Sequence, residues 1–136
     1  LASDTTTKDR DRAAALILTA WDEERLTADD LVSAWRSPWR GIREFSAPRV
    51  TETLGRIADA GGLALTWPLL TVMAEEISGQ ERIPAPASTV LESLLHYLPE
   101  VRAAGVPVDL PNVTALARRK APIKAVRVAK LIASRL

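Results

Sequence analysis

Apolar residues recur at intervals of three and four positions along most of this chain, and that spacing predicts amphipathic helices. The longest such run predicts a helix over residues 87–104 that is bent by Pro99 and ended by Gly105. The helix predicted over residues 66–79 has an alternative start at Leu63, with a bend at Pro68. The predicted helices cover residues 11–25, 27–35, 46–61, 66–79, 87–104, 109–120 and 122–136.

Polar residues that can cap a helix stand where several of these runs begin. Thr27 is suited to accept a hydrogen bond from the first turn, with Asp30 three residues later as in a capping box. Ser46, Thr66 and Asp109 hold the same place before their own runs, and a proline suited to a first turn follows each of them two residues later. These signals set the predicted starts of four helices.

A short pattern also repeats along the chain. The segment "LGRIADAG" at 54–61 aligns with "LPEVRAAG" at 98–105, at an offset of 44 residues. The predicted caps Thr27, Thr66 and Asp109 lie 39 and 43 residues apart. Helix pairs at such a period are typical of HEAT-like repeats. We therefore predict an all-α fold of seven to eight helices, either a HEAT-like short α-solenoid or an irregular multi-helix bundle.

Length and composition fit one helical domain. The chain has 136 residues, of which 47% are hydrophobic and 26% charged, and this length allows a single core. We expect residues 1–10 to be a flexible segment and residues 11–136 to form the single domain. Because the chain begins at Leu1 and not at Met, we also expect it to be excised from a larger protein.

The chain contains no cysteine, which excludes disulfides, zinc ribbons and thiol catalysis. No uninterrupted apolar run approaches the ~20 residues of a membrane-spanning helix. The opening "LASDTTTKDRDR" lacks the hydrophobic centre of a secretion signal. These features favour a cytoplasmic location with no membrane partner.

Charge is distributed unevenly along the chain. Residues 1–117 hold 11 basic and 17 acidic residues, a net charge of −6, whereas residues 118–136 hold 7 basic and no acidic residues. On a helical wheel the basic residues of the last helix fall within about 140°, opposite a set of small aliphatic residues. Three interpretations stay open: a solvated outer face, a surface for an acidic protein or another part of the same polypeptide, and a nucleic-acid surface. The candidate residues are Lys120, Lys124, Arg127 and Lys130, with Arg135 on the same arc.

The segment "WRSPWRGIR" is a second candidate partner surface. It brings together Trp35, Arg36, Trp39 and Arg40 around a proline, and tryptophan and arginine are enriched at binding hot spots. The alternative is structural, with Trp35 completing the apolar stripe of its helix and Trp39 packing at the corner that follows.

Catalytic chemistry finds little support in the sequence. Nucleophile elbows, Walker loops, dinucleotide-binding glycine motifs and HExxH motifs are all missing. One constellation, Glu92, His96 and Glu100, shares a helix face and would suit a metal or proton site, with a solvated charged face as its alternative. Pro99 bends the helix between these groups, so we predict no enzyme activity, no cofactor and no metal.

Three segments carry a resemblance to a known kind of protein. They are "AGGLALTWPLL", "LLHYLPEVRAAGVPVDLPNVTALARR" and "ARRKAPIKAVRVAKLIASRL", and arginine (14) far exceeds lysine (4), as in GC-rich genomes. In these features the chain resembles the C-terminal helical, HEAT-like repeat region of actinobacterial proteins of unknown function. The resemblance transfers no catalytic residue and implies a non-catalytic interaction or scaffold domain of a larger bacterial protein. The alternative function is a nucleic-acid-associated domain that uses the basic face of the C-terminal helix.

Overall fold

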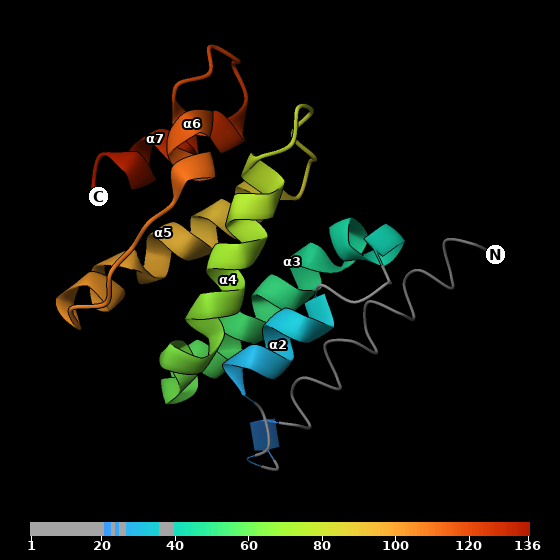
Figure 1. Ribbon diagram of the computed structural model, residues 1–136, viewed down its shortest axis with the longest axis vertical. Helices are drawn as coiled ribbons and strands as arrows, with labels where there is room; N and C mark the ends of the chain where they lie inside the picture. The colour runs from blue at the N-terminus through green and yellow to red at the C-terminus, as the bar shows by residue number, and fades with distance from the viewer. Residues whose placement is uncertain (1–20, 23, 25–26, 36–39) are drawn as a thin grey trace. The chain divides into compact units, whose positions relative to one another are not determined.

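The computed structural model describes residues 21, 22, 24, 27–35 and 40–136, without the side chains of 34, 35 and 40–47. The described residues contain helices and no strands, which confirms the all-α prediction (Figure 1). The elements are α2 (Ala28–Trp35), α3 (Arg40–Ile57), η1 (Ala58–Gly62), α4 (Leu63–Ser78), α5 (Ala87–Ala103), α6 (Pro111–Ala117) and α7 (Lys124–Ala133).

The short turn η1 joins α3 to α4 without a loop, and the non-helical backbone of Gly61 kinks the chain between them. With α3 and α4 counted as one kinked helix, the described residues contain five helices. The predicted number of seven or eight is not confirmed. Most of the helix predicted over residues 11–25 lies outside the described ranges, as do the N-terminal segment 1–10 and residues 36–39.

The junction between α3 and α4 agrees with the predicted stop at Gly61 but corrects the predicted start at Thr66. Gly61 adopts a left-handed backbone (φ 98°), as a helix stop should, but no loop follows it. The chain enters α4 directly at Leu63, the alternative start. Thr66 is therefore inside a helix, where its buried hydroxyl donates to the carbonyl of Leu63 at 3.4 Å and caps nothing. The signal misled because a threonine before a proline looks the same in the second turn of a helix as at its cap.

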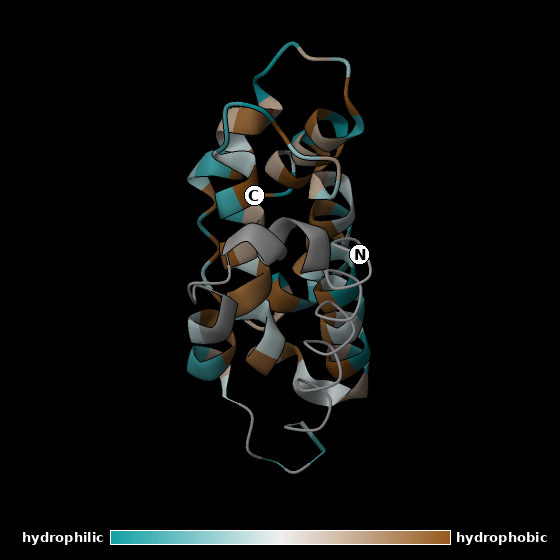
Figure 2. Cartoon of the chain, turned by 90° about the vertical axis from the view of Figure 1, so that its right-hand side faces the viewer, coloured by the Kyte–Doolittle hydropathy of each residue, from teal (hydrophilic) through white to brown (hydrophobic). Residues whose placement is uncertain are grey.

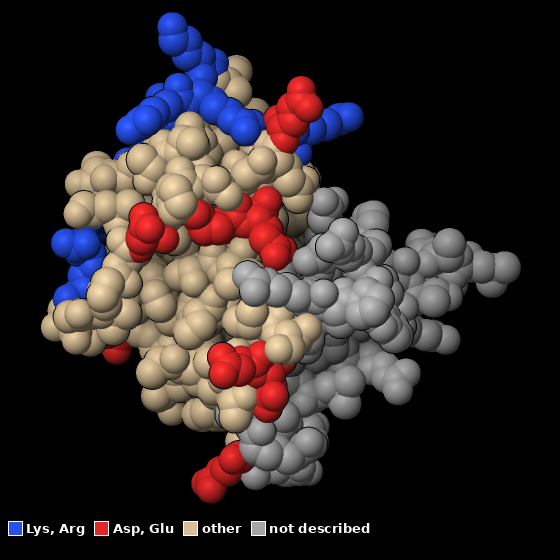
Figure 3. Space-filling view, in the orientation of Figure 1, with Lys and Arg blue, Asp and Glu red and all other residues tan. Residues whose placement is uncertain are grey.

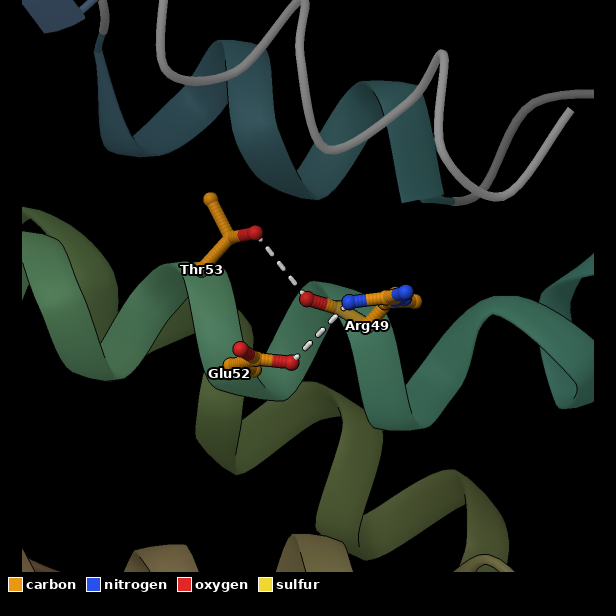
Figure 4. A network of polar contacts seen from close by, with 3 residues as sticks. All are labelled: Arg49, Glu52 and Thr53. Atoms are coloured by element: carbon orange, nitrogen blue, oxygen red, sulfur yellow. Dashed lines mark hydrogen bonds and ion pairs between the residues drawn. The ribbon is translucent and has the colours of Figure 1, made fainter. Parts of the chain in front are cut away.

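The start of α3 is also earlier than predicted. The helix begins at Arg40 and includes Pro48, whereas Ser46 was expected to cap it. A proline fixes φ near the helical value wherever it stands, so its presence does not distinguish a first turn from an interior one. Beyond Pro48 the helix is regular: Thr53 Oγ1 donates to the carbonyl of Arg49 at 3.0 Å, and Arg49 Nη1 donates to Glu52 Oε2 at 3.5 Å (Figure 4).

The chain divides into two compact units, residues 1–70 and 71–136. In the first unit, the predicted cap of α2 is confirmed because the Asp30 amide donates to Thr27 Oγ1 at 3.1 Å. Gly62 lies so close to Trp21 that a Cβ there would come within 3.0 Å of the indole ring. The buried apolar residues of this unit include Leu31, Val50, Leu54, Ile57, Trp67, Leu69 and Leu70.

In the second unit, α7 packs against both α5 and α6. Hydrophobic and hydrophilic residues alternate along the helices, as their amphipathic patterns require (Figure 2). Helix α5 ends before Gly105, which has a left-handed φ of 76°, as predicted. The buried apolar residues are Met73, Ala74 and Ile77 of α4, Ala87, Val90, Leu91, Leu94, Tyr97, Leu98 and Val101 of α5, Leu110, Val113 and Leu116 at α6, and Ala125, Val126, Val128, Ala129 and Ile132 of α7.

A carboxylate from a distant helix caps α6. Pro111 occupies the first helical position and has no N–H to satisfy, while the amides of Asn112 and Val113 donate to Glu75 Oε1 at 3.1 Å and Oε2 at 2.9 Å. The Asn112 side chain in turn donates to the Glu75 carbonyl at 3.0 Å. Asp109, the predicted cap, is exposed, and Leu110 takes the N-cap position instead. The unpaired amides at the start of α6 are therefore satisfied by a carboxylate 37 residues away in the sequence.

A second polar link joins the segments that follow α4 and α6. The guanidinium of Arg119 donates to the carbonyls of Gln80 at 2.9 Å and Glu81 at 3.1 Å. Carbonyls after a helix C-terminus lack partners within the helix, so an arginine is a suitable donor for them. Gly79 permits the close approach of Asn112 to the end of α4, because a Cβ at position 79 would lie 2.8 Å from the side-chain nitrogen Nδ2 of Asn112.

One described stretch, Pro48–Ser78, is long and apolar enough to span a membrane by length and composition, with a window of mean hydropathy 1.4. The sequence-based expectation considered only uninterrupted apolar runs and so passed over it. Half of the window is buried inside the protein, and the left-handed Gly61 lies within the stretch. The core helix of a soluble protein passes the same test, so this stretch is weak support for a membrane span.

Candidate interaction surface

Helix α7 has one buried side and one exposed side, as the sequence predicted. Its small aliphatic residues from Ala125 to Ile132 are buried, and Ala129 and Ile132 have no exposed surface at all. The apolar residues just outside the helix, Ala121 before it and Leu136 after it, are exposed. Contact with α5 and α6 fixes which side of α7 faces outward.

The exposed side of α7 carries the predicted basic residues. Lys120, Lys124, Arg127 and Lys130 are all exposed, as is Arg135 after the end of the helix. In Figure 3, basic side chains gather over the segment that joins α6 to α7. Not all seven basic residues of the tail belong to this surface, since Arg119 is turned toward the carbonyls after α4.

Lys124 is the one member of this group with a described ion pair. Its Nζ lies 2.6 Å from Glu92 Oε1 of α5. Both side chains are about half exposed, so the pair contributes little to stability. For Arg127, Lys130 and Arg135, no ion pair occurs within the described part of the chain. Their charge is thus left for solvent or for a partner.

Large apolar side chains interrupt this basic surface. Leu131 is 50% exposed and Ile123 is 38% exposed, and both lie among the basic residues. Leu131 follows Arg127 by one helical turn and Lys124 by two, so the three form a row along the exposed side. We call Lys124, Arg127, Lys130, Leu131 and Arg135 the α7 surface.

The second predicted surface lies largely outside the described residues. Arg36 and Trp39 lie outside the described residues, and for Trp35 and Arg40 only the backbone is described. Trp35 is the last residue of α2 and Arg40 the first of α3. Whether the four side chains come together stays a prediction.

The hypothetical site at Glu92, His96 and Glu100 loses one of its groups to another interaction. Glu92 is paired with Lys124, and the ring of His96 makes an edge-on contact with Tyr97, with centroids 4.7 Å apart. Among the described residues, no group of three or more histidine, cysteine or acidic side chains is arranged to hold a metal ion. Sequence reasoning placed Glu92 on a helix face but had no means of knowing that α7 would lie against that face.

A scan against protein-family models, a search of curated proteins and a search of solved structures each gave no match to this chain.

Proposed function

We propose that this chain is a non-catalytic, helical-repeat interaction or scaffold domain of a larger cytoplasmic bacterial protein. The observation that carries the proposal is the α7 surface, where a half-exposed leucine stands among cations that no acidic residue of the tail offsets. The exposed half of Leu131 contributes nothing to folding, whereas apolar and arginine side chains side by side are typical of protein-binding surfaces.

The repeat component of the proposal has support at some positions and not at others. Leu54 and Leu98 are both buried at equivalent places, and Gly61 and Gly105 both adopt left-handed backbones. The caps that completed the pattern do not correspond, since Thr66 lies inside α4 and α6 is capped by Glu75. The repeat component of the proposal therefore rests on buried leucines and glycine positions and not on equivalent turns.

A capture experiment tests the interaction role. The purified chain is immobilised, exposed to lysate of the bacterium that encodes it, and washed with and without an excess of the free chain. We expect at least one protein to be retained, to be displaced by the free chain, and to bind again when both proteins are pure, as measured by titration calorimetry. If no retained protein is displaced, or if the pure pair does not bind, the proposed function is wrong.

A nucleic-acid-associated function is the second candidate, favoured by the exposed cations Lys120, Arg127 and Lys130. Phosphate contacts release counterions, so binding of labelled duplex or single-stranded DNA should weaken steeply between about 50 and 200 mM salt. Absence of salt-dependent binding at about 50 mM removes this candidate.

A further inference from the structure

We propose that the α7 surface binds an acidic amphipathic helix of a partner protein, with Leu131 packed against its apolar residues. This inference deepens the proposed function and rests on it. It adds the surface used, the chemistry of the partner and the residues that select it.

Charge complementarity indicates the sign of the partner's charge. The last 19 residues carry seven basic and no acidic side chains. Arg127, Lys130 and Arg135 are exposed and have no ion pair within the described part of the chain. Carboxylates placed opposite them would form charge-assisted hydrogen bonds, which for arginine are often bidentate. The partner is therefore acidic.

The placement of Leu131 gives the shape of the partner. Lys124, Arg127 and Leu131 form a row along one side of α7, about 10 Å long at 1.5 Å per residue. A row of this kind fits a second helix laid alongside it, with apolar residues spaced by three or four positions and acidic residues flanking them. An acidic chain without apolar residues would leave the exposed half of Leu131 in water.

Two other classes of partner fit the same surface less well. A lipid bilayer would need the apolar side of α7, but Val126, Ala129 and Ile132 are already buried against the rest of the protein. A nucleic acid would meet the cations but gain nothing from Leu131, and residues 118–136 contain no aromatic side chain for base stacking. Both classes are included as outcomes of the test.

The test uses the full chain and two synthetic peptides of one composition. The patterned peptide is a fluorescein-labelled helix of about four turns with leucines spaced by three and four and glutamates beside them. The scrambled peptide has the same residues without that spacing. A DNA duplex and vesicles that contain phosphatidylserine are the other probes. Binding is measured by fluorescence anisotropy for the peptides and the duplex and by co-sedimentation for the vesicles.

We expect the patterned peptide to bind at least about tenfold more tightly than the scrambled one. The substitution Leu131→Ser should remove most of that preference while leaving the charge unchanged. The double variant Arg127→Glu/Lys130→Glu should weaken binding of both peptides by more than about tenfold. A double variant with the same charge change elsewhere, Arg82→Glu/Arg102→Glu, should bind as the unmodified chain does, because both side chains are exposed and lie off α7.

Several results would overturn the inference. They are equal binding of the two peptides, no effect of Leu131→Ser, equal weakening by the two charge-reversal variants, and tighter binding of the duplex or vesicles than of the patterned peptide. All of these substitutions are at exposed positions, and circular dichroism verifies that each variant is folded. If the partner found by capture binds Arg127→Glu/Lys130→Glu undiminished, the inference fails while the proposed interaction function stands.

Discussion

Removal of the Glu75 carboxylate should destabilise the second unit through the start of α6. The carboxylate accepts both the Asn112 and the Val113 amide, and the substitution Glu75→Ala leaves these two donors without a protein partner. Water can reach the Asn112 amide, but the bond to Val113 is part-buried. Helix α6 has only seven residues, and so short a helix depends on such contacts.

The magnitude follows from the two bonds and the helix dipole. Loss of an N-cap side chain costs about 1 kcal/mol, and loss of a negative charge at a helix N-terminus costs about 0.5 kcal/mol more. The part-buried amide of Val113 adds up to about 1 kcal/mol, because an unpaired donor retains its desolvation cost. We therefore expect Glu75→Ala to lower the free energy of unfolding by about 2 kcal/mol. The conservative variant Glu75→Gln, which keeps one acceptor but no charge, should lower it by about half as much.

The assay is urea unfolding followed by circular dichroism, together with hydrogen exchange of individual amides. With a urea dependence of about 1.5 kcal/mol per molar, the unfolding midpoint should fall by about 1.3 M. The substitution should speed hydrogen exchange of the Asn112 and Val113 amides more than exchange of the α5 amides. The matched control is Glu100→Ala, an exposed glutamate in α5. The reasoning is refuted if Glu75→Ala and Glu100→Ala have the same midpoint and the two amides keep their protection.

Three further substitutions follow from the same packing, each measured by urea unfolding. Gly79→Ala should lower the free energy of unfolding by about 1–2 kcal/mol, because its Cβ meets the Asn112 side chain and disturbs the bond to Glu75; an unchanged midpoint would contradict this. Gly105→Ala should cost about 1 kcal/mol through its left-handed φ of 76° alone, as open space surrounds the position; a cost near zero would show that the backbone relaxes. Thr51→Val should raise the free energy of unfolding by about 1 kcal/mol, since the buried hydroxyl has no hydrogen-bond partner within the described part of the chain; destabilisation would reveal a hydrogen bond at that atom.

The candidate surface was predictable to the extent that it depends on one helix. Helical spacing places Lys124, Arg127 and Lys130 opposite the small aliphatic residues of α7, and the structure confirms this division. The ion pair of Lys124 with Glu92 was not predictable, because it joins residues of two helices whose relative placement no local pattern encodes. For Trp35, Arg36, Trp39 and Arg40 the prediction stands untested.

The sequence alone determined the secondary structure class, the apolar stripes and the glycine stops, because these depend on neighbours within a few positions. The stripe of α4, the extent of α5 and the cap at Thr27 are all examples. Tertiary structure decided what holds the helix ends. Threonine and proline at positions 66 and 68 suit both a helix start and an interior turn, and in the folded chain they lie inside α4, which begins at Leu63. At α6 the cap is Glu75, 37 residues away, and not the local candidate Asp109, because only the folded chain brings that carboxylate to the unpaired amides.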